Sequence, residues 1–276
     1  MPALDLTHAL AGFTAASAEL LGERALLRRV DTKFVIPADL LPGLLAPLGE
    51  HYAALGLAQA AAASEPRAPT AGSPYRASAE SGPGAPYRTL YFDTDDLRCF
   101  HDHRRGRRIR DKIRIRHYDD RRVSYLEVKS RRNASHTDKH RRQIDYGQDT
   151  IDERGRHFLH KHSVVPAEVL RPELWVDYRR LMLIGRDRDE RCTFDVALAV
   201  STPDRARSAP ALDKIVFVEV KQPMVDLSSP VMRGLAAIHQ RPRSASKYIF
   251  AVTSLHPEVR ANRLLPDLRS LHRMAR

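Results

Sequence analysis

The sequence predicts an α+β fold in which antiparallel strands form a barrel with a polar interior and helices pack on its apolar outside. Two observations lead to this prediction. Several segments alternate between apolar and charged residues with a period of two, as strands do, and segments with helical periodicity lie between them. The 276 residues, 42% of them hydrophobic, are enough to bury a sizeable core.

Charge and cysteine content narrow the class of protein. The formal net charge of +12 indicates an anionic partner, which is nucleic acid, a membrane surface or a molecule rich in phosphate. Cys99 and Cys192 are far apart and form neither a disulfide framework nor a CxxC pair, which favours a reducing compartment. The N-terminus lacks a signal-peptide pattern and no run of 18 apolar residues occurs, so we expect a soluble cytoplasmic protein.

The N-terminal elements are expected in the order helix, strand, helix. Residues 8–24 have apolar residues at helical spacing. Residues 29–36 alternate like a strand, with charged residues on one face. Residues 37–48 begin with proline, which suits the first turn of a helix, and carry a leucine stripe.

Residues 58–86 are rich in Ala, Pro, Ser and Gly. Such a composition buries too little apolar surface to offset the entropy of ordering, so we expect a disordered loop. The segment before it is too short to close a core by itself. We therefore expect one domain over residues 1–276, with the loop as an insertion.

The rest of the chain continues the alternation of strands and helices. Expected strands cover residues 87–92, 109–118, 123–131, 174–184, 191–200, 214–221 and 248–253. Expected helices cover residues 94–103, 151–162 and 230–239.

The charged strand faces are the feature that needs an explanation. For a single strand the simplest one is a face turned to water. Five strands share the pattern, however: Arg29/Asp31/Lys33, Lys112/Arg114/Arg116, Glu127/Lys129/Arg131, Arg191/Asp195 and Glu219/Lys221. If these faces line a common interior, the crowded cations are tolerable only when a polyanion or a metal-bound phosphate occupies it.

A series of short motifs, in order along most of the chain, resembles a known family. The motifs are RVDTKF at 29–34, YRTLYFDTDDLRCF at 87–100, KIRIRHY at 112–118, YLEVK at 125–129, KHRRQ at 139–143, VDYRR at 176–180, RCTFD at 191–195, FVEVK at 217–221 and SKY at 246–248. They resemble the polyphosphate polymerase (VTC) domain of the CYTH, or triphosphate tunnel metalloenzyme, superfamily. No single motif is specific, but the set in this order is.

The resemblance implies an eight-stranded antiparallel tunnel, a divalent metal (Mn²⁺ or Mg²⁺) and transfer of the ATP γ-phosphate to polyphosphate or pyrophosphate. By motif position it implies catalytic cations at Arg114, Arg116, Lys129, Arg180 and Lys247. It implies phosphate or nucleotide contacts from Lys33, Lys112, Lys139, Arg191, Lys221 and Tyr248. Glu219 is the first metal-ligand candidate, and Glu127, Asp195 and Asp31 follow.

The residue types suit this chemistry independently of the resemblance. Phosphoryl transfer depends on positioning and on stabilising charge at the equatorial oxygens. Arginine offers two-pronged contacts to phosphate and lysine a compact charge. A carboxylate is still needed because a hard cation takes oxygen ligands, of which phosphates can supply the rest.

One departure bears on the type of reaction. Hydrolytic members of the superfamily open with ExExK, whereas this chain has Arg29, Asp31 and Lys33. One carboxylate fewer weakens activation of a metal-bound water, which favours the polymerase. An inorganic or nucleoside triphosphatase of the same fold and a non-catalytic binder of polyphosphate or another polyanion remain alternatives, and a membrane partner is compatible with each.

Two further patterns carry no functional prediction. His157, His160 and His162 lack a cysteine or carboxylate at ligand spacing, so a metal site there is not expected. The arginines of 104–110 are not accompanied by a nucleic-acid readout motif, so we expect a basic rim and no specific nucleic-acid partner. The oligomeric state is left open.

Overall fold

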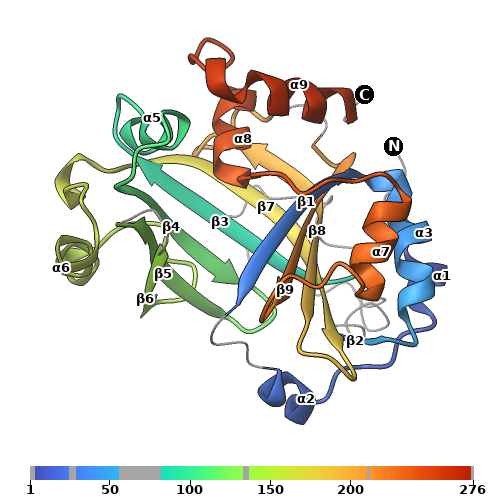
Figure 1. Ribbon diagram of the computed structural model, residues 1–276. Coiled ribbons are helices and arrows are strands. Elements are labelled where there is room, and N and C mark those ends of the chain that lie inside the picture. The colour runs from blue at the N-terminus through green and yellow to red at the C-terminus, as the bar shows by residue number, and fades with distance from the viewer. Residues whose placement is uncertain (1–3, 25–28, 56–81, 133–136, 210–211, 275–276) are drawn as a thin grey trace.

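The computed structural model describes all residues except 1–3, 25–28, 56–81, 133–136, 210–211 and 275–276. Its centre is one curled sheet whose strands follow the order β1-β9-β8-β7-β3-β4-β5-β6, with β2 paired to β7 (Figure 1). The strands are β1 (Val30–Pro37), β2 (Tyr52–Leu55), β3 (Ala85–Asp93), β4 (Arg110–Tyr118), β5 (Val123–Arg131), β6 (Thr137–Ile144), β7 (Arg171–Gly185), β8 (Arg191–Ser201) and β9 (Ile215–Gln222).

The predicted fold class is confirmed. Neighbouring strands of the sheet are antiparallel, and eight of the nine lie on one continuous path. The path curls as in a tunnel, but β1 and β6 form its two ends and are not hydrogen-bonded to each other. The sheet is therefore barrel-like and has a seam.

One side of the sheet packs under the N-terminal helices and α7. Alternate residues of β1, β8 and β9 point outward into an apolar cluster that includes Phe34, Ile36, Phe194 and Val218. Helices α1 (Thr7–Leu10), α3 (Leu41–Leu45) and α7 (Pro230–Ala237) cover it (Figure 1). Because strand side chains alternate, the residues between these apolar positions face the interior.

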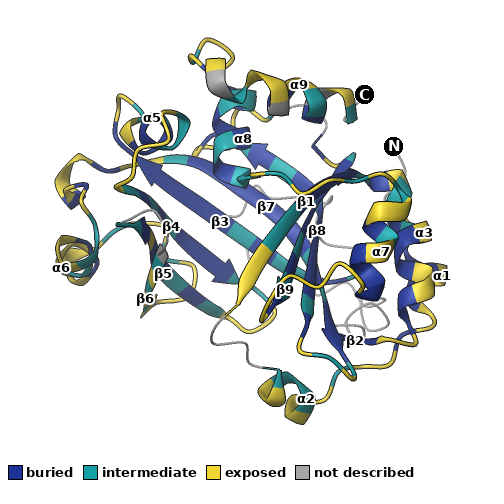
Figure 2. Ribbon diagram, in the orientation of Figure 1, coloured by how far each residue is buried: buried dark blue, intermediate teal, exposed yellow. Residues whose placement is uncertain are grey.

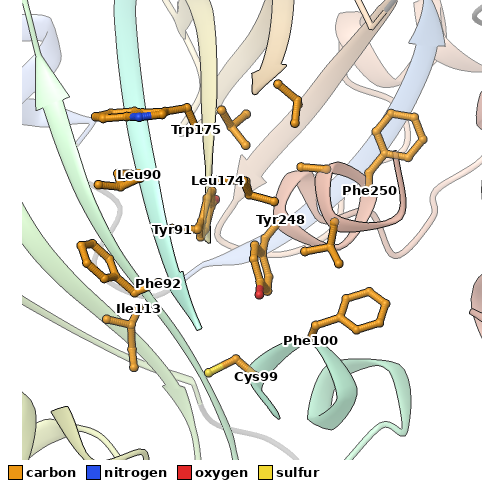
Figure 3. Close-up of a cluster of buried hydrophobic side chains, with 14 of the residues drawn as sticks. Leu90, Tyr91, Phe92, Cys99, Phe100, Ile113, Leu174, Trp175, Tyr248 and Phe250 are labelled. Carbon is orange, nitrogen blue, oxygen red and sulfur yellow. The ribbon is translucent and has the colours of Figure 1, made fainter. Parts of the chain in front are cut away.

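The second apolar cluster lies under α5 (Arg98–Arg104), α6 (Glu153–His162), α8 (Lys247–Leu255) and α9 (Leu265–Met274). Ile113 and Ile115 of β4 and Leu126 and Val128 of β5 belong to it. Figure 3 shows its centre, where aromatic rings of β3 meet those of α8. In Figure 2 most strand segments are buried, whereas the start of β1 is exposed.

Most predicted elements are present, with shifted ends. The expected helix over residues 37–48 consists of three short pieces, namely the 3-10 turn Ala38–Leu40, α3 and the 3-10 turn Ala46–Leu48. The expected helix over 8–24 is divided into α1 and α2 (Ala18–Glu23), because Thr14 and Ala16 hydrogen-bond with Ala54 of β2 instead. Tertiary pairing here overrides helical periodicity.

The strand predicted over 248–253 is wrong, since this segment is helix α8. Its buried residues Tyr248, Ala251, Val252 and Leu255 have the spacing of one helix face. Strands β2 and β6 and helix α9 were not predicted. Of the expected loop at 58–86, residues 58–81 lie outside the described part, and β3 begins at Ala85. Within the described residues no helix is long and apolar enough to cross a bilayer.

Candidate functional site

The interior faces of β4, β5 and β6 form successive rows of charged side chains. Lys112, Lys129 and Lys139 lie opposite one another in the strand register, a group we call the lysine row. Arg114, Glu127 and Arg141 form the next row. Like charges directly opposite each other destabilise a sheet, so the pair of Lys112 and Lys129 is costly without an anion, whereas Lys139 contacts Glu127.

Burial and mutual repulsion lower the pKa values of two lysines in the lysine row. Burial, followed by the charges of Lys129 and Lys33, holds the pKa of Lys112 well below its usual range. Partial removal from water and the charge of Lys33 lower the pKa of Lys129 to about 8. Lys112 also donates a 2.9 Å hydrogen bond to Ser246 Oγ at the start of α8. A bound anion would favour the charged form of both lysines.

Glu127 is the counterion of the neighbouring row. Its side chain is 1% exposed, and its Oε2 accepts hydrogen bonds of 2.8 and 2.6 Å from Arg114. Lys139 Nζ lies 2.7 Å from Oε1, and Arg116 lies 4.0 Å from Oε2. These cations outweigh burial and hold the pKa of Glu127 below its usual range. Both oxygens are thus engaged with cations, which leaves little capacity for a metal.

Asp195 is the second interior counterion. Arg180 donates to both of its oxygens, at 2.6 and 2.8 Å, and Lys247 also contacts it. Its side chain is 3% exposed. Arg180 and Asp195 are register partners on β7 and β8, whereas Lys247 comes from the first turn of α8. Helix α8 therefore inserts one predicted cation into the interior, and the pKa of Asp195 is lowered despite burial.

A third group lies on β1 and β9, where Lys221 bridges two carboxylates. Its Nζ is 2.5 Å from Glu219 Oε2 and 3.4 Å from Asp31 Oδ2. Lys33 lies 3.8 Å from the other oxygen of Glu219, and Arg29 donates to Asp31 at 3.1 Å. Although burial opposes ionisation, Lys221 and Lys33 lower the pKa of Glu219 to about 2.

Glu219 is the carboxylate that best fits a divalent metal. It is partly exposed, and in the described part of the chain the cation at its Oε1 is Lys33 at 3.8 Å, whereas Glu127 and Asp195 are enclosed by cations. No group of three or more metal-binding side chains occurs in the described residues. A hard cation held here would accordingly take one protein carboxylate and obtain further oxygens from phosphate.

Tyrosines that we did not assign to the site form part of the interior surface. The guanidinium groups of Arg116 and Arg180 lie over the rings of Tyr87 and Tyr178 at 5.0–6.0 Å, and Lys247 lies 5.0 Å from the Tyr178 ring. These contacts fix the cations at aromatic faces. The signal was present in the sequence, because Tyr178 is two residues from Arg180 and thus shares its strand face.

Tyr248 and Arg191 have separate hydrogen-bond partners, although Arg191 is the register partner of Lys221 on β9. The Tyr248 hydroxyl donates to buried Asp93, which also accepts from the backbone of Cys99 and Phe100, and its ring stacks on Tyr91 (Figure 3). The Tyr248 hydroxyl therefore faces Asp93, and its contact with phosphate stays a prediction. Arg191 shares the interior strand face but donates to the Leu21 carbonyl oxygen.

The sequence matches one protein-family model over most of its length. A model of the VTC domain matches residues 28–256. No protein with a curated description matches the chain. Similar solved structures include a candidate adenylate cyclase from Bacillus halodurans, 10% identical over 80% of this chain and 95% of the other, with a TM-score of 0.46. Another is a candidate adenylyl cyclase from Hippeastrum described as having a dominant triphosphatase activity, 15% identical over 80% and 93%, with a TM-score of 0.40.

Proposed function

Because the chain belongs to the VTC domain family, we propose that it is a metal-dependent polyphosphate polymerase that transfers the γ-phosphate of ATP to a growing polyphosphate chain. The observation that carries the proposal is the lysine row, three cations in register on one interior face. Such a row is an unfavourable structural element and a favourable polyanion site. Polyphosphate supplies one negative charge at each unit of its chain, which matches a series of evenly spaced cations.

The residues divide the task of positioning the phosphates. Arg114, Arg116 and Arg180 offer planar forks to phosphate oxygens, and Lys247 and Lys129 offer compact charges. Lys33, Lys112, Lys139 and Lys221 extend the cationic surface along the interior. Because the reaction proceeds mainly through charge stabilisation and alignment, fixed cations supply most of what the protein must contribute.

Glu219 would hold the divalent metal, Mn²⁺ or Mg²⁺. When bound, the metal would neutralise phosphate oxygens and orient the triphosphate. Glu127 and Asp195 are assigned a different role. Each keeps arginine and lysine side chains in place before the substrate arrives, which reduces the reorganisation needed on binding.

The geometry of Asp31 favours the polymerase over the triphosphatase. Both of its oxygens have cationic partners, Arg29 and Lys221. A carboxylate engaged in this way has little free capacity to hold a metal, so it is poorly suited to positioning a metal-bound water. The triphosphatase remains the second candidate because Glu219 alone could still hold a metal.

Incubation of the purified protein with ATP and Mn²⁺ tests the proposal. The products to measure separately are free phosphate and long polyphosphate chains. Long chains without equivalent phosphate release support the polymerase, whereas phosphate alone supports the triphosphatase. If neither product forms but polyphosphate still binds in a salt-sensitive way, the protein is a binder and both enzymatic proposals fail.

Two further proposals accompany the activity. We propose one domain over residues 1–276, since the strands β1 to β9 all belong to one sheet. We propose a cytoplasmic location, where ATP is available and where Cys99 and Cys192 would stay as free thiols. A membrane partner is compatible with both.

A further inference from the structure

The interior rows of the β4–β5 hairpin differ in charge along the strands. Five register pairs have side chains on the interior face: Arg110 with Arg131, Lys112 with Lys129, Arg114 with Glu127, Arg116 with Tyr125, and Tyr118 with Val123. The first two pairs contain cations alone. The third contains the buried counterion Glu127, and the fourth places a tyrosine opposite the arginine. The fifth pair is uncharged, so positive charge is concentrated in the two pairs at the strand ends next to α5.

Arg110 and Arg131, here called the rim pair, form the last register pair at the α5 end of the hairpin. Two arginines in direct register repel each other, and burial together with Arg131 lowers the pKa of Arg110. Within the described residues, Arg110 Nε is buried without a hydrogen-bond partner, although a terminal nitrogen of Arg110 donates to the Arg107 carbonyl oxygen. The loop before it, residues 105–109, is exposed and carries further arginines. The cationic surface thus continues from the interior to the outside.

At the turn of the hairpin, the opposite end, the arginines have aromatic and acidic neighbours. Arg121 and Arg122 lie in its turn, and each contacts an aromatic ring, that of Tyr118 at 5.0 Å and that of Tyr146 at 4.9 Å. Arg121 is also paired with Asp120 at 3.5 Å. Tyr118, the last residue of β4, is an aromatic end to the row of cations. At the α5 end a polyanion would therefore meet two arginines in register with each other. At the turn it would meet arginines that already contact aromatic rings or a carboxylate.

The length of the track bears on the substrate class. Arg110 and Arg116 are six residues apart on one strand, which corresponds to about 20 Å at the rise of a β-strand. A triphosphate is shorter than this track, whereas a linear polymer can contact all of it.

We propose that the growing polyphosphate chain leaves the interior over Arg110 and Arg131, so that the rim pair is a polymer-binding port distinct from the triphosphate site. This inference rests on the proposed function, since it assumes a linear polyphosphate as ligand. It assigns the chain a direction: the reacting end lies near Arg114, Arg116 and Arg180, and the extending chain passes the lysine row and then the rim pair.

Paired binding measurements test the port. The double variant Arg110→Gln/Arg131→Gln is compared with the matched control Arg121→Gln/Arg122→Gln, which removes the same charge from the other end of the same hairpin. The probes are inorganic tripolyphosphate and long-chain polyphosphate, measured by calorimetry at several salt concentrations. We expect the rim variant to bind long chains about fivefold or more weakly, with unchanged tripolyphosphate affinity. For long chains, the slope of log affinity against log salt concentration should become shallower by about 0.7 to 1 for each phosphate that is no longer neutralised.

Other outcomes separate the port from the proposed function. Equal losses in the two double variants, or a larger loss in the control, would overturn the assigned direction. Loss of tripolyphosphate affinity in the rim variant would also overturn it, because the rim would then belong to the triphosphate site. If the unaltered protein binds neither probe, the proposed function fails as well. Thermal unfolding of both variants checks the fold, and we expect the rim variant to be at least as stable as the parent because repulsion is relieved.

Discussion

Arg180 and Asp195 face each other across β7 and β8 with two hydrogen bonds of 2.6 and 2.8 Å, and Lys247 of α8 closes on the same carboxylate. The contact ties the sheet to a helix that follows it in sequence. It also sets two of the proposed catalytic cations relative to each other. Asp195 is therefore the centre of a clamp formed by these three residues.

Asp195→Asn should lower the free energy of unfolding by about 3 kcal/mol, because two buried cations lose their counterion. Tripolyphosphate should stabilise the variant more than the parent, since phosphate replaces the missing charge. Urea denaturation with and without tripolyphosphate measures both effects. The control is Asp189→Asn, whose carboxylate is 57% exposed in its pair with Arg24 and should matter little. Similar losses in the two variants would contradict a special role for the clamp.

Substitutions of Arg114 and Arg116 should differ in their effect on stability, although the two residues are neighbours on one strand face. Arg114→Met removes the main partner of Glu127 and should cost about 3 kcal/mol of unfolding free energy. Arg116→Met removes a buried cation that lies 4.0 Å from Glu127, and it should leave stability unchanged or raised. Both should weaken tripolyphosphate binding by about tenfold or more. Equal stability of the two variants would refute the assignment of Glu127 as a counterion.

Binding should weaken as pH rises through about 8, where Lys129 loses its proton in the free protein. Between this value and the unfolded value of 10.5 the unfolded chain binds more protons at this position. This lysine's contribution to stability therefore increases with pH in that window, while phosphate, which needs the charged form, binds with proton uptake. Calorimetry from pH 7 to 9 should show about a tenfold loss of tripolyphosphate affinity. Lys129→Met should remove this pH dependence, and its persistence would assign the titration to another group.

Glu219→Gln should abolish metal binding that depends on phosphate. Electron paramagnetic resonance of Mn²⁺, titrated into protein with tripolyphosphate, reports binding without relying on turnover. Asp31→Asn should have the smaller effect, because cations lie 3.1 and 3.4 Å from the two oxygens of Asp31, whereas Lys33 lies 3.8 Å from Glu219 Oε1. If Asp31→Asn removes the bound Mn²⁺ and Glu219→Gln does not, the two carboxylates have been assigned in the wrong order.

Tyr248→Phe should destabilise the protein by about 1 to 3 kcal/mol, since Asp93 loses a buried hydrogen-bond donor. Affinity for tripolyphosphate should stay the same, because the hydroxyl faces Asp93. Thermal unfolding and calorimetry on one preparation separate the two quantities. A large loss of affinity with normal stability would place Tyr248 in the phosphate site.

Elements were predictable where the apolar pattern was strong. Strands β4, β5, β8 and β9 alternate clearly, and their apolar residues are buried as expected. β6, with the sequence TDKHRRQI, has one large apolar residue and is an edge strand, so periodicity could not reveal it. The short apolar run that forms α8 fits a buried strand equally well, and only packing against β7 and β8 decides for a helix.

The sequence by itself determined which strand faces carry charge, because alternation follows directly from strand geometry. It also determined the family, because the motifs recur in order along the chain. Tertiary structure alone decided how the charges combine. Register places Glu127 between Arg114 and Arg141, Lys139 reaches Glu127 from the neighbouring row, and the docking of α8 brings Lys247 to Asp195. These contacts join residues distant in sequence. Only the folded sheet therefore shows which arginines have a carboxylate partner and which lysines lie opposite another lysine.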